Sequence, residues 1–213
     1  STDVFIAKLD AASGVLDAAF GDGDGGGGFD NDGIVQLNAS NTNSATGLED
    51  IYSLALDGVG NLFISGYTAS ALGGVNGGTD DAFVAKLGTT SGVLDSSFGD
   101  GDGINDDGIV QLNASNTNSA AGADFAKSVL LNSGEVFVAG YTSSSLGGTN
   151  AGLDDIFIAK LNGATGTLDT SFGDGDGIND DGIMQLNTGQ VVRGAPKDEI
   201  IYAMVKDPDG YLY

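Results

Sequence analysis

Three acidic segments carry the residues best suited to chemistry, because each sets several carboxylates close together among glycines. The clearest copies are FGDGDGINDDGIVQL at 98–112 and FGDGDGINDDGIMQL at 172–186, and a longer version, FGDGDGGGGFDNDGIVQL, occupies 20–37. Glycine lets the backbone curl so that nearby side chains converge. Short Asp/Asn/Gly loops supply the roughly six to eight oxygen ligands that Ca²⁺ prefers. The sequence therefore predicts a calcium site in each segment.

The predicted calcium ligands are Asp and Asn side chains of these three segments. They are Asp22, Asp24, Asp30 and Asp32 in the first, Asp100, Asp102, Asn105 and Asp107 in the second, and Asp174, Asp176, Asn179 and Asp181 in the third. The pattern differs from an EF-hand loop, which ends on a bidentate Glu and lies between two helices. Asp, Asn and Gly also suit solvent-exposed turns, and such turns are the alternative to calcium binding.

Composition excludes several classes of protein. The chain has 213 residues, of which 30 are acidic and seven basic, and its formal net charge is −23. Such a charge repels nucleic acid and anionic membranes, so nucleic-acid binding is excluded. It also opposes compaction unless cations bind or screen it, which favours calcium as a partner; solvation of an acidic surface at high salt is the alternative. No apolar run is long enough for a spanning helix, so membrane insertion is not expected.

Catalytic constellations are scarce in this chain. It contains no His, Cys or Trp, and Arg193 is the only arginine, so nucleophilic triads, thiol nucleophiles and arginine clamps for phosphate are missing. The acidic segments repeat, whereas an active site normally occurs once and breaks local repetition. The chain is therefore expected not to be an enzyme, and a calcium-dependent hydrolase or a glycosidase pair of carboxylates is the alternative.

A repeat of about 75 residues organises the chain. Lys8, Lys86 and Lys160 occupy the same place in FIAKL, FVAKL and FIAKL, and Gly66 and Gly140 the same place in ISGYT and VAGYT. No segment shows helical periodicity over three turns, so helices are not expected. Segments rich in Val, Ile, Phe and Tyr predict four strands in one period, at 108–113, 125–131, 136–142 and 156–161, with a hairpin turn at 132–134.

Four strands per period are typical of one blade of a β-propeller. The expected fold is all-β, with four-stranded blades in tandem that form part of a larger propeller, since natural propellers have roughly four to eight blades. The expected units are 1–32 (outer strand of a preceding blade and its acidic loop), 33–107 and 108–181 (complete blades with acidic loops), and 182–213 (the first half of a further blade). Each acidic segment would then join the outer strand of one blade to the inner strand of the next.

Incomplete blades at both ends of the chain have two explanations. The chain could be a piece of a longer protein, or the loose strands of separate copies could pair, which would give head-to-tail rings or filaments. Copies of the chain are therefore candidate partners, beside calcium, glycans and other surface proteins.

Three smaller recurring features also lead to predictions. The Phe that opens each acidic segment, Phe20, Phe98 or Phe172, is expected to form a wedge between blades. The three lysines of the FIAKL-type motifs are expected to protect an outer edge strand against aggregation. The loops LGGVNGGTDD at 72–81 and LGGTNAGLDD at 146–155 are expected to be polar turns whose Asp caps the next strand, with cation or sugar binding as the alternative.

The motifs of the repeat resemble those of a bacterial family. G-x-L-D-x-S-F-G at 92–99 and 166–173, V-A-G-Y-T at 138–142 and D-D-x-F-x-A-K-L at 154–161 are similar to the bacterial β-propeller repeats called SBBP and delta-sixty, and the similarity covers nearly the whole chain. The repeat here is longer than in the shorter members, and its Asp-rich insertion is expanded. The resemblance implies a secreted or surface-attached bacterial protein whose propellers serve as spacers, adhesive modules or binding platforms, and it implies no catalytic residue.

Residues and resemblance together lead to one functional expectation. The chain is expected to be a non-catalytic extracellular or cell-surface module with a structural or adhesive role, as in a filament or surface layer, stabilised by calcium in its Asp/Gly-rich loops. A carbohydrate-binding domain or a calcium-dependent hydrolase on a β-propeller is the alternative.

Overall fold

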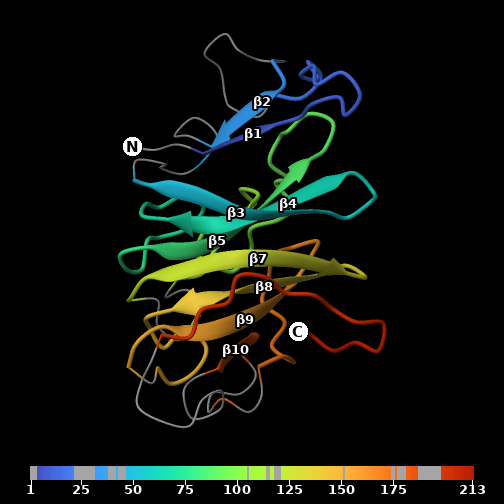
Figure 1. The fold of residues 1–213 in the computed structure, drawn as a ribbon. Coiled ribbons are helices and arrows are strands. Elements are labelled where there is room, and N and C mark those ends of the chain that lie inside the picture. Colours follow the sequence, from blue (N-terminus) through green and yellow to red (C-terminus); the bar gives the residue numbers. More distant parts are fainter. Residues whose placement is uncertain are drawn as a thin grey trace.

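The chain is all-β in the part that the structure, a computed structural model, describes. The described residues are 4–21, 32–37, 42, 47–104, 106–113, 116–117, 121–150, 152–173, 176, 181–186 and 198–213. They form ten strands in three antiparallel sheets and contain no helix. The expectation of an all-β chain is confirmed, and Figure 1 shows the sheets stacked face to face.

Two four-stranded sheets form the body of the stack. The first contains, in hydrogen-bonded order, β3 (Glu49–Leu56), β4 (Asn61–Thr68), β5 (Asp81–Gly88) and β6 (Ile109–Gln111). The second contains, in the equivalent order, β7 (Asp124–Asn132), β8 (Glu135–Thr142), β9 (Asp155–Asn162) and β10 (Ile183–Leu186). All neighbours are antiparallel. The predicted number of four strands per repeat is therefore confirmed.

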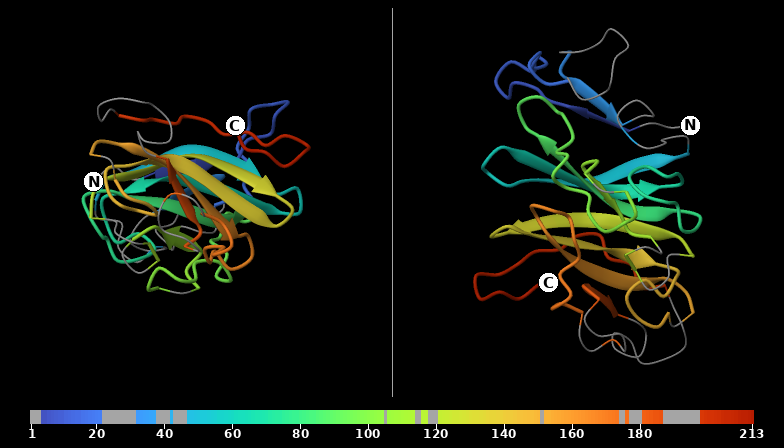
Figure 2. Two further views of the ribbon diagram at one scale, coloured as in Figure 1. Left: turned by 90° about the horizontal axis from the view of Figure 1, so that it is seen from below. Right: turned by 180° about the vertical axis from the view of Figure 1, so that it is seen from behind.

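A smaller element lies at each end of the stack. At one end, β1 (Val4–Ala7) and β2 (Ile34–Leu37) form an antiparallel pair. At the other end, residues 198–213 pack against the second four-stranded sheet and contain a hairpin (Figure 2), in which Val205 and Tyr213 exchange two backbone hydrogen bonds of 2.9 Å. The chain thus presents a partial sheet at both ends.

The pairing of β6 corrects one prediction. The sequence predicts that 108–113 opens the next blade, but Ile109, Val110 and Gln111 pair with β5, so β6 closes the sheet that β3 opens. The acidic segment 98–108 therefore joins neighbouring strands of one sheet, and the prediction that it joins successive blades is wrong. The acidic segment before β10 has the same place, since β10 pairs with β9. The sequence pattern shows that 108–113 is an apolar strand. It does not show whether that strand joins the preceding sheet or the following one.

The glycine of the ISGYT and VAGYT motifs faces a β-bulge. The register shifts between Ile51 and Ser53 in β3 and at the same place in β7. A Cβ atom on Gly66 would overlap the carbonyl oxygen of Asp50, and one on Gly140 would overlap the carbonyl oxygen of Phe125. The bulge pushes a carbonyl group toward the neighbouring strand, and only glycine leaves room for it.

The predicted hairpin between β7 and β8 is confirmed. Its two turn residues, Ser133 and Gly134, have φ angles of 51° and 86°. Positive φ at both central positions defines a type I′ turn, whose twist matches that of the flanking strands.

Apolar side chains between the stacked sheets form the core. Phe98 is fully buried in a cluster with Val136 and Val138 of the following sheet, and its ring meets Phe63 edge-on at a centroid distance of 5.7 Å. Phe20 is buried in the equivalent cluster below β1 and β2. The wedge prediction is thus confirmed for both residues. Phe172 is half-buried and packs beside the hairpin in 198–213.

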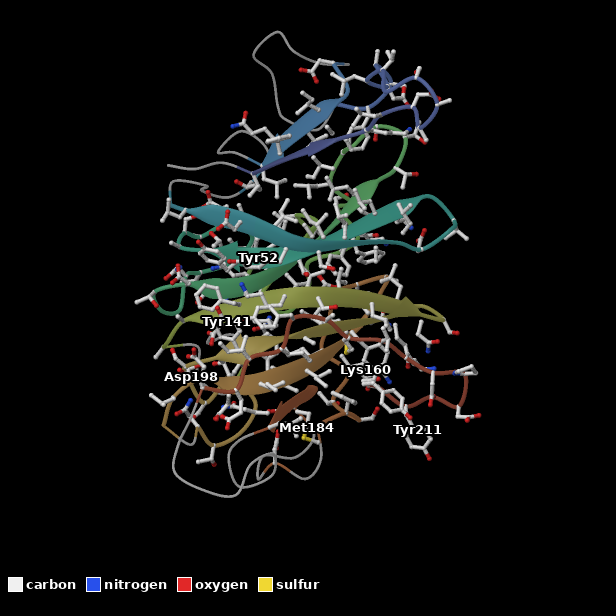
Figure 3. The ribbon with its side chains drawn as sticks, viewed as in Figure 1. Tyr52, Tyr141, Lys160, Met184, Asp198 and Tyr211 are labelled. Carbon is white, nitrogen blue, oxygen red and sulfur yellow. The ribbon has the colours of Figure 1, made fainter. Side chains whose placement is uncertain are left out.

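A row of aromatic rings crosses from the first four-stranded sheet to the second near one end of the strands. Tyr52 stacks on Tyr67 at 5.9 Å, Tyr67 meets Phe125 at 4.8 Å, and Phe125 meets Tyr141 at 4.9 Å. Lys127 Nζ lies 3.2 Å from the centroid of the Tyr52 ring. Figure 3 shows Tyr52 and Tyr141 on the same side of the stack. These contacts add to the apolar core between the sheets.

One hydrogen bond recurs at successive sheet junctions. The backbone N–H of Val129 in β7 donates to Ser53 Oγ of β3 at 3.2 Å, and the N–H of Met204 donates to Ser128 Oγ of β7 at 3.2 Å. Donor and acceptor are 76 residues apart in both cases. The hairpin in 198–213 therefore docks on the second sheet as β7 docks on the first. The stack does not close on itself within the described residues, so a closed propeller stays a prediction.

Candidate metal sites and buried carboxylates

The second Asp of the described acidic loops holds the loop against the following strand. Asp102 is fully buried, and its Oδ2 accepts a 2.7 Å hydrogen bond from the backbone N–H of Gln111 in β6. Its Oδ1 accepts from the N–H of Ile104 at 3.2 Å. Asp176 repeats the main bond, to the N–H of Gln185 in β10, at 2.7 Å. Burial raises the pKa of Asp102 to about 6, and the neighbouring charge of Asp100 adds to the shift.

The last Asp of each acidic loop opens the strand that follows. Asp32, Asp107 and Asp181 each accept, through Oδ1, the backbone N–H two residues later, at 2.8, 2.9 and 2.9 Å. Such a local bond fixes a turn at the start of a strand. A Cβ atom on Gly99 would lie only 2.7 Å from Asp107 Oδ1, so the glycine after the wedge Phe makes room for this carboxylate.

The second oxygen of this last Asp is the strongest sign of a ligand. Asp107 Oδ2 and Asp181 Oδ2 are buried and find no hydrogen-bond donor among the described residues. Burial raises the pKa of Asp107 to about 7 and that of Asp181 to about 6. The charges of Asp102 and Asp176, respectively, raise these pKa values further. The second and last Asp of a loop thus lie near enough for the charge of one to raise the pKa of the other.

Only some of the predicted calcium ligands are among the described residues. Asp22, Asp24, Asp30, Asn105, Asp174 and Asn179 lie outside the described residues. In the part of the chain that is described, no three or more Asp or Glu side chains are arranged to hold a metal ion. Paired carboxylates with one donor-free oxygen suit a hard cation, but Ca²⁺ takes roughly six to eight oxygens. The remaining predicted ligands or water would have to complete the site, so calcium binding remains a proposal.

Sequence reasoning missed a buried glutamine that ties the sheet ends to the long β4–β5 loop. Gln111 Nε2 donates to Asp81 Oδ2 at 2.7 Å and to the carbonyl of Ser70 at 3.0 Å, and its Oε1 accepts from the N–H of Gly74 at 3.1 Å. Gln185 makes the same contacts in the second sheet. The signal in the sequence was a Gln at the same place in each IVQL or IMQL strand. Asp81 is fully buried and also accepts from Gly77 N at 2.7 Å, a bond that holds the loop before β5; that it caps the next strand stays a prediction.

A second set of buried carboxylates, which the sequence reasoning also missed, lies where the four-stranded sheets meet. Asp124, at the start of β7, is fully buried and accepts from the hydroxyl groups of Thr142 and Ser144. Its Oδ2 has no donor within the described ranges. Its backbone N–H donates to the carbonyl of Asp80 in the preceding sheet at 2.8 Å. Burial raises the pKa of Asp124 to about 7, with further contributions from Asp81 and Asp80.

Two of the three lysines of the FIAKL-type motifs, Lys86 and Lys160, do not protect an edge. Lys86 lies on β5, which is paired on both sides, and Lys160 lies on β9, which is likewise internal. Lys86 is buried, contacts Asp95 at 2.8 Å and lies 5.8 Å from the ring centroid of Phe63. The edge prediction is wrong for these two lysines because the strand that follows each acidic segment covers this edge. Lys8 follows β1, which pairs only with β2 among the described strands. The lysine instead joins the strand to the wedge Phe and the loop before it.

Comparisons with known proteins add no family to this geometry. Neither protein-family models nor curated protein sequences gave a match to the chain. A search of the described residues for a helix with the length and apolarity needed to cross a bilayer found none.

Proposed function

We propose that this chain is a non-catalytic structural or adhesive module of a secreted or surface-attached protein, built from propeller-type blades and stabilised by Ca²⁺ in its acidic segments. The observation that carries the proposal is the buried, donor-free oxygen of Asp107, which recurs at Asp181 one repeat later. The net charge of −23 and the repetition of these loops point to a stabilising role.

A buried carboxylate without a partner is costly unless it is protonated or meets a cation. When bound, Ca²⁺ supplies positive charge to oxygens that the folded protein has removed from water. Extracellular calcium modules bind in the range of about 10⁻⁴ to 10⁻³ M, so each ion would add roughly 0.5 to 2 kcal/mol at millimolar calcium. Several sites together would contribute a large share of a marginal folding free energy.

The acidic segment also contacts the next sheet, so calcium that fixes the segment would stabilise this contact as well. The backbone N–H groups of Gly99 and Asp100 both donate to the carbonyl of Thr165, at 3.0 and 2.9 Å, and Thr165 belongs to the following sheet's loop. A segment held in place by Asp102 and Asp107 therefore presents fixed donors to its neighbour. In this arrangement, ordering one loop stabilises the junction between two sheets.

Thermal unfolding with CaCl₂ and with a chelator tests the proposal. We expect calcium to raise the melting temperature by more than MgCl₂ or NaCl at equal ionic strength, since general screening affects all acidic side chains alike. Asp107→Asn should remove part of the calcium response without destabilising the chelated protein. It removes a buried charge that opposes folding at neutral pH, and the amide oxygen can still accept from Ile109.

Asp209→Asn is the matched control, since Asp209 is an exposed Asp in the turn of the hairpin in 198–213. It should respond to calcium as the unmodified chain does. Equal melting temperatures in calcium and chelator, or an undiminished response in Asp107→Asn, would show that the acidic segments act as turns alone.

A carbohydrate-binding role is the second candidate, and the aromatic row favours it. Tyr52 is partly exposed, and the Tyr67 hydroxyl donates to Asp50 Oδ2 at 3.1 Å beside it. Aromatic faces next to carboxylates suit sugar rings, which offer both apolar faces and hydroxyl groups. Glycan-array binding that is lost in Tyr52→Ala would support this role.

A further inference from the structure

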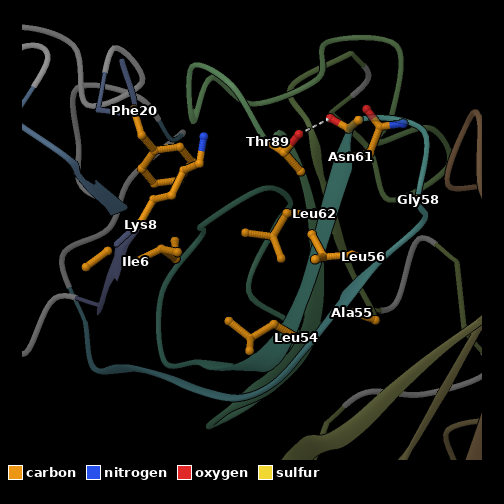
Figure 4. A pocket seen from close by; sticks show the side chains of 12 residues that line it. Ile6, Lys8, Phe20, Leu54, Ala55, Leu56, Gly58, Asn61, Leu62 and Thr89 are labelled. Carbon is orange, nitrogen blue, oxygen red and sulfur yellow. Dashed lines mark hydrogen bonds between the residues drawn. The ribbon is translucent and has the colours of Figure 1, made fainter. Parts of the chain in front are cut away.

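An open cavity of about 660 Å³ separates the β1–β2 pair from the first four-stranded sheet. Figure 4 shows Ile6, Lys8 and Phe20 on one side and Leu54 and Leu56 on the other. Leu54 is 58% exposed although it lies on a strand of the sheet stack. The lining is mostly apolar, so this groove leaves hydrophobic surface in contact with water.

The same groove is filled at the next junction, by the hairpin β3–β4. There the ring of Phe63 meets the wedge residue Phe98 at 5.7 Å and lies 5.8 Å from Lys86 Nζ. Phe20 and Lys8 are the equivalents of Phe98 and Lys86 in the repeat, and both line the open cavity. Among the described residues that line the cavity, the two partners of an aromatic ring are therefore present and an equivalent of Phe63 is not.

The strand edge next to the cavity is open as well. β5 pairs with β6 on one side and with β4 on the other, whereas β1, its equivalent, pairs only with β2 within the described residues. Phe63 stands opposite Lys86 in the β4–β5 register, and Phe137 stands opposite Lys160 in the β8–β9 register. A hairpin that filled the groove would thus place its aromatic residue opposite Lys8.

The hairpin within residues 198–213 has the required residues. Its sequence IYAMVKDPDGYLY repeats the pattern of β3 and β4, IYSLALDGVGNLF, and Tyr213 takes the place of Phe63. Its inner face is already docked, since Met204 bonds to Ser128 as Val129 bonds to Ser53. Its outer face is bare: Tyr213 is 71% exposed and Val205 is 60% exposed.

We propose that this hairpin of one copy of the chain inserts into the β1–β2 groove of a second copy. The strand at 211–213 pairs with β1, Tyr213 lies between Phe20 and Lys8, and the strand at 201–206 covers Leu54 and Leu56. The result is a four-stranded sheet in the order of the two complete ones, with two strands from each copy. A second copy is the occupant because its hairpin carries the residues that the repeat places at this position.

The two surfaces lie at opposite ends of the stack, so the contact is head-to-tail (Figures 1 and 2). Head-to-tail contacts close into a ring when the rotation between copies permits and otherwise extend into a filament.

Sedimentation velocity over a range of concentrations tests the proposal on the 213-residue chain. We expect concentration-dependent species heavier than the 21.2 kDa monomer, with calcium and with chelator alike, because neither surface contains a predicted calcium ligand. A groove variant, Leu54→Ser/Leu56→Ser, and a hairpin variant, Val205→Ser/Tyr213→Ser, should each raise the dissociation constant at least ~10-fold.

Mixing the two variants gives the sharpest result. Each retains one intact surface, so a mixture should form a 1:1 dimer at concentrations where each variant alone is monomeric. Val75→Ser/Leu153→Ser, which removes two exposed apolar side chains from equivalent loops outside the groove, should associate as the unmodified chain does. Circular dichroism checks that all variants fold.

Two outcomes would overturn the proposal. One is a folded chain that stays monomeric at every concentration. The other is an oligomer whose stability is unaffected by the groove and hairpin variants. Both differ from failure of the calcium proposal, which is measured by the melting temperature of the monomer.

Discussion

Buried carboxylates that lack a counter-charge are the main residue-level feature of this protein. Asp102, Asp107, Asp124 and Asp181 all have pKa values raised mainly by loss of water. Exposed carboxylates behave in the opposite way: hydrogen bonds from Lys160 and then from Ser171 lower the pKa of Asp169 to about 2. The interior carboxylates therefore oppose folding at neutral pH, and the surface ones favour it.

Asp124→Asn should separate this effect from calcium binding, because Asp124 is not a predicted ligand. The folded pKa of about 7 lies above the usual value near 3.9 for an unfolded chain. The contribution of the group to stability is thus complete below about pH 4 and is lost as the pH rises through 7. The amide keeps an acceptor for Thr142 and Ser144, and we expect the free energy of unfolding to rise by roughly 1 to 3 kcal/mol at pH 8.

Urea titrations at pH 4 and pH 8 in chelator measure this change. The gain should be much smaller at pH 4, where Asp124 is neutral in the folded state and only about half ionised in the unfolded chain. Asp209→Asn, at an exposed position, is the control. If Asp124→Asn were destabilised equally at both pH values, removal of the negative charge would not stabilise the fold, and the prediction would be contradicted.

At the scale of single elements, the β-bulge in the first strand of each four-stranded sheet requires a glycine on the neighbouring strand. Gly140→Ala would force a methyl group into the carbonyl of Phe125, which is rigid backbone. We expect a loss of about 3 kcal/mol or more in the free energy of unfolding, by chemical denaturation. Gly88→Ala is the control: its Cβ would have its nearest contact at 3.4 Å, and its loss should stay below about 1 kcal/mol. Similar losses in both variants would contradict a role for the bulge.

Local patterns were sufficient to predict the strands, the hairpin turn at 132–134 and the wedge residues Phe20 and Phe98. Each of these depends on neighbours in the sequence and on whether a side chain is apolar. The partner of β6 could not be predicted in this way, since pairing depends on which strand edge is free in three dimensions.

The candidate site was predictable only in part, for a related reason. Asp, Asn and Gly are recognisable as loop formers, and Asp102 lies near enough to Asp107 for its charge to raise the pKa of Asp107. The burial of Gln111, Asp81 and Asp124 was not predicted. A polar side chain is expected at the surface unless its hydrogen-bond partners, which here are distant in the sequence, are known.

At the scale of the whole molecule, stability should increase from the ends of the stack toward its middle. Strands β5 and β9 are paired on both sides and lie between packed layers, whereas β1 has one partner strand in the described part of the chain. At concentrations where the chain is monomeric, the amides of β1 should exchange with solvent at least ~10-fold faster than those of β5. Hydrogen exchange followed by mass spectrometry measures this, and equal rates would indicate that the stack unfolds as one unit.

The recurring serine contact also bears on how such a chain could grow. Ser53 and Ser128 present the same acceptor to whatever sheet follows, at an interval of 76 residues between acceptor and donor. Duplication of one such stretch of gene would add a sheet whose backbone N–H can donate to the serine of the sheet before it. No compensating mutation would be needed. Length could therefore vary among descendants far more readily than the composition of any single layer.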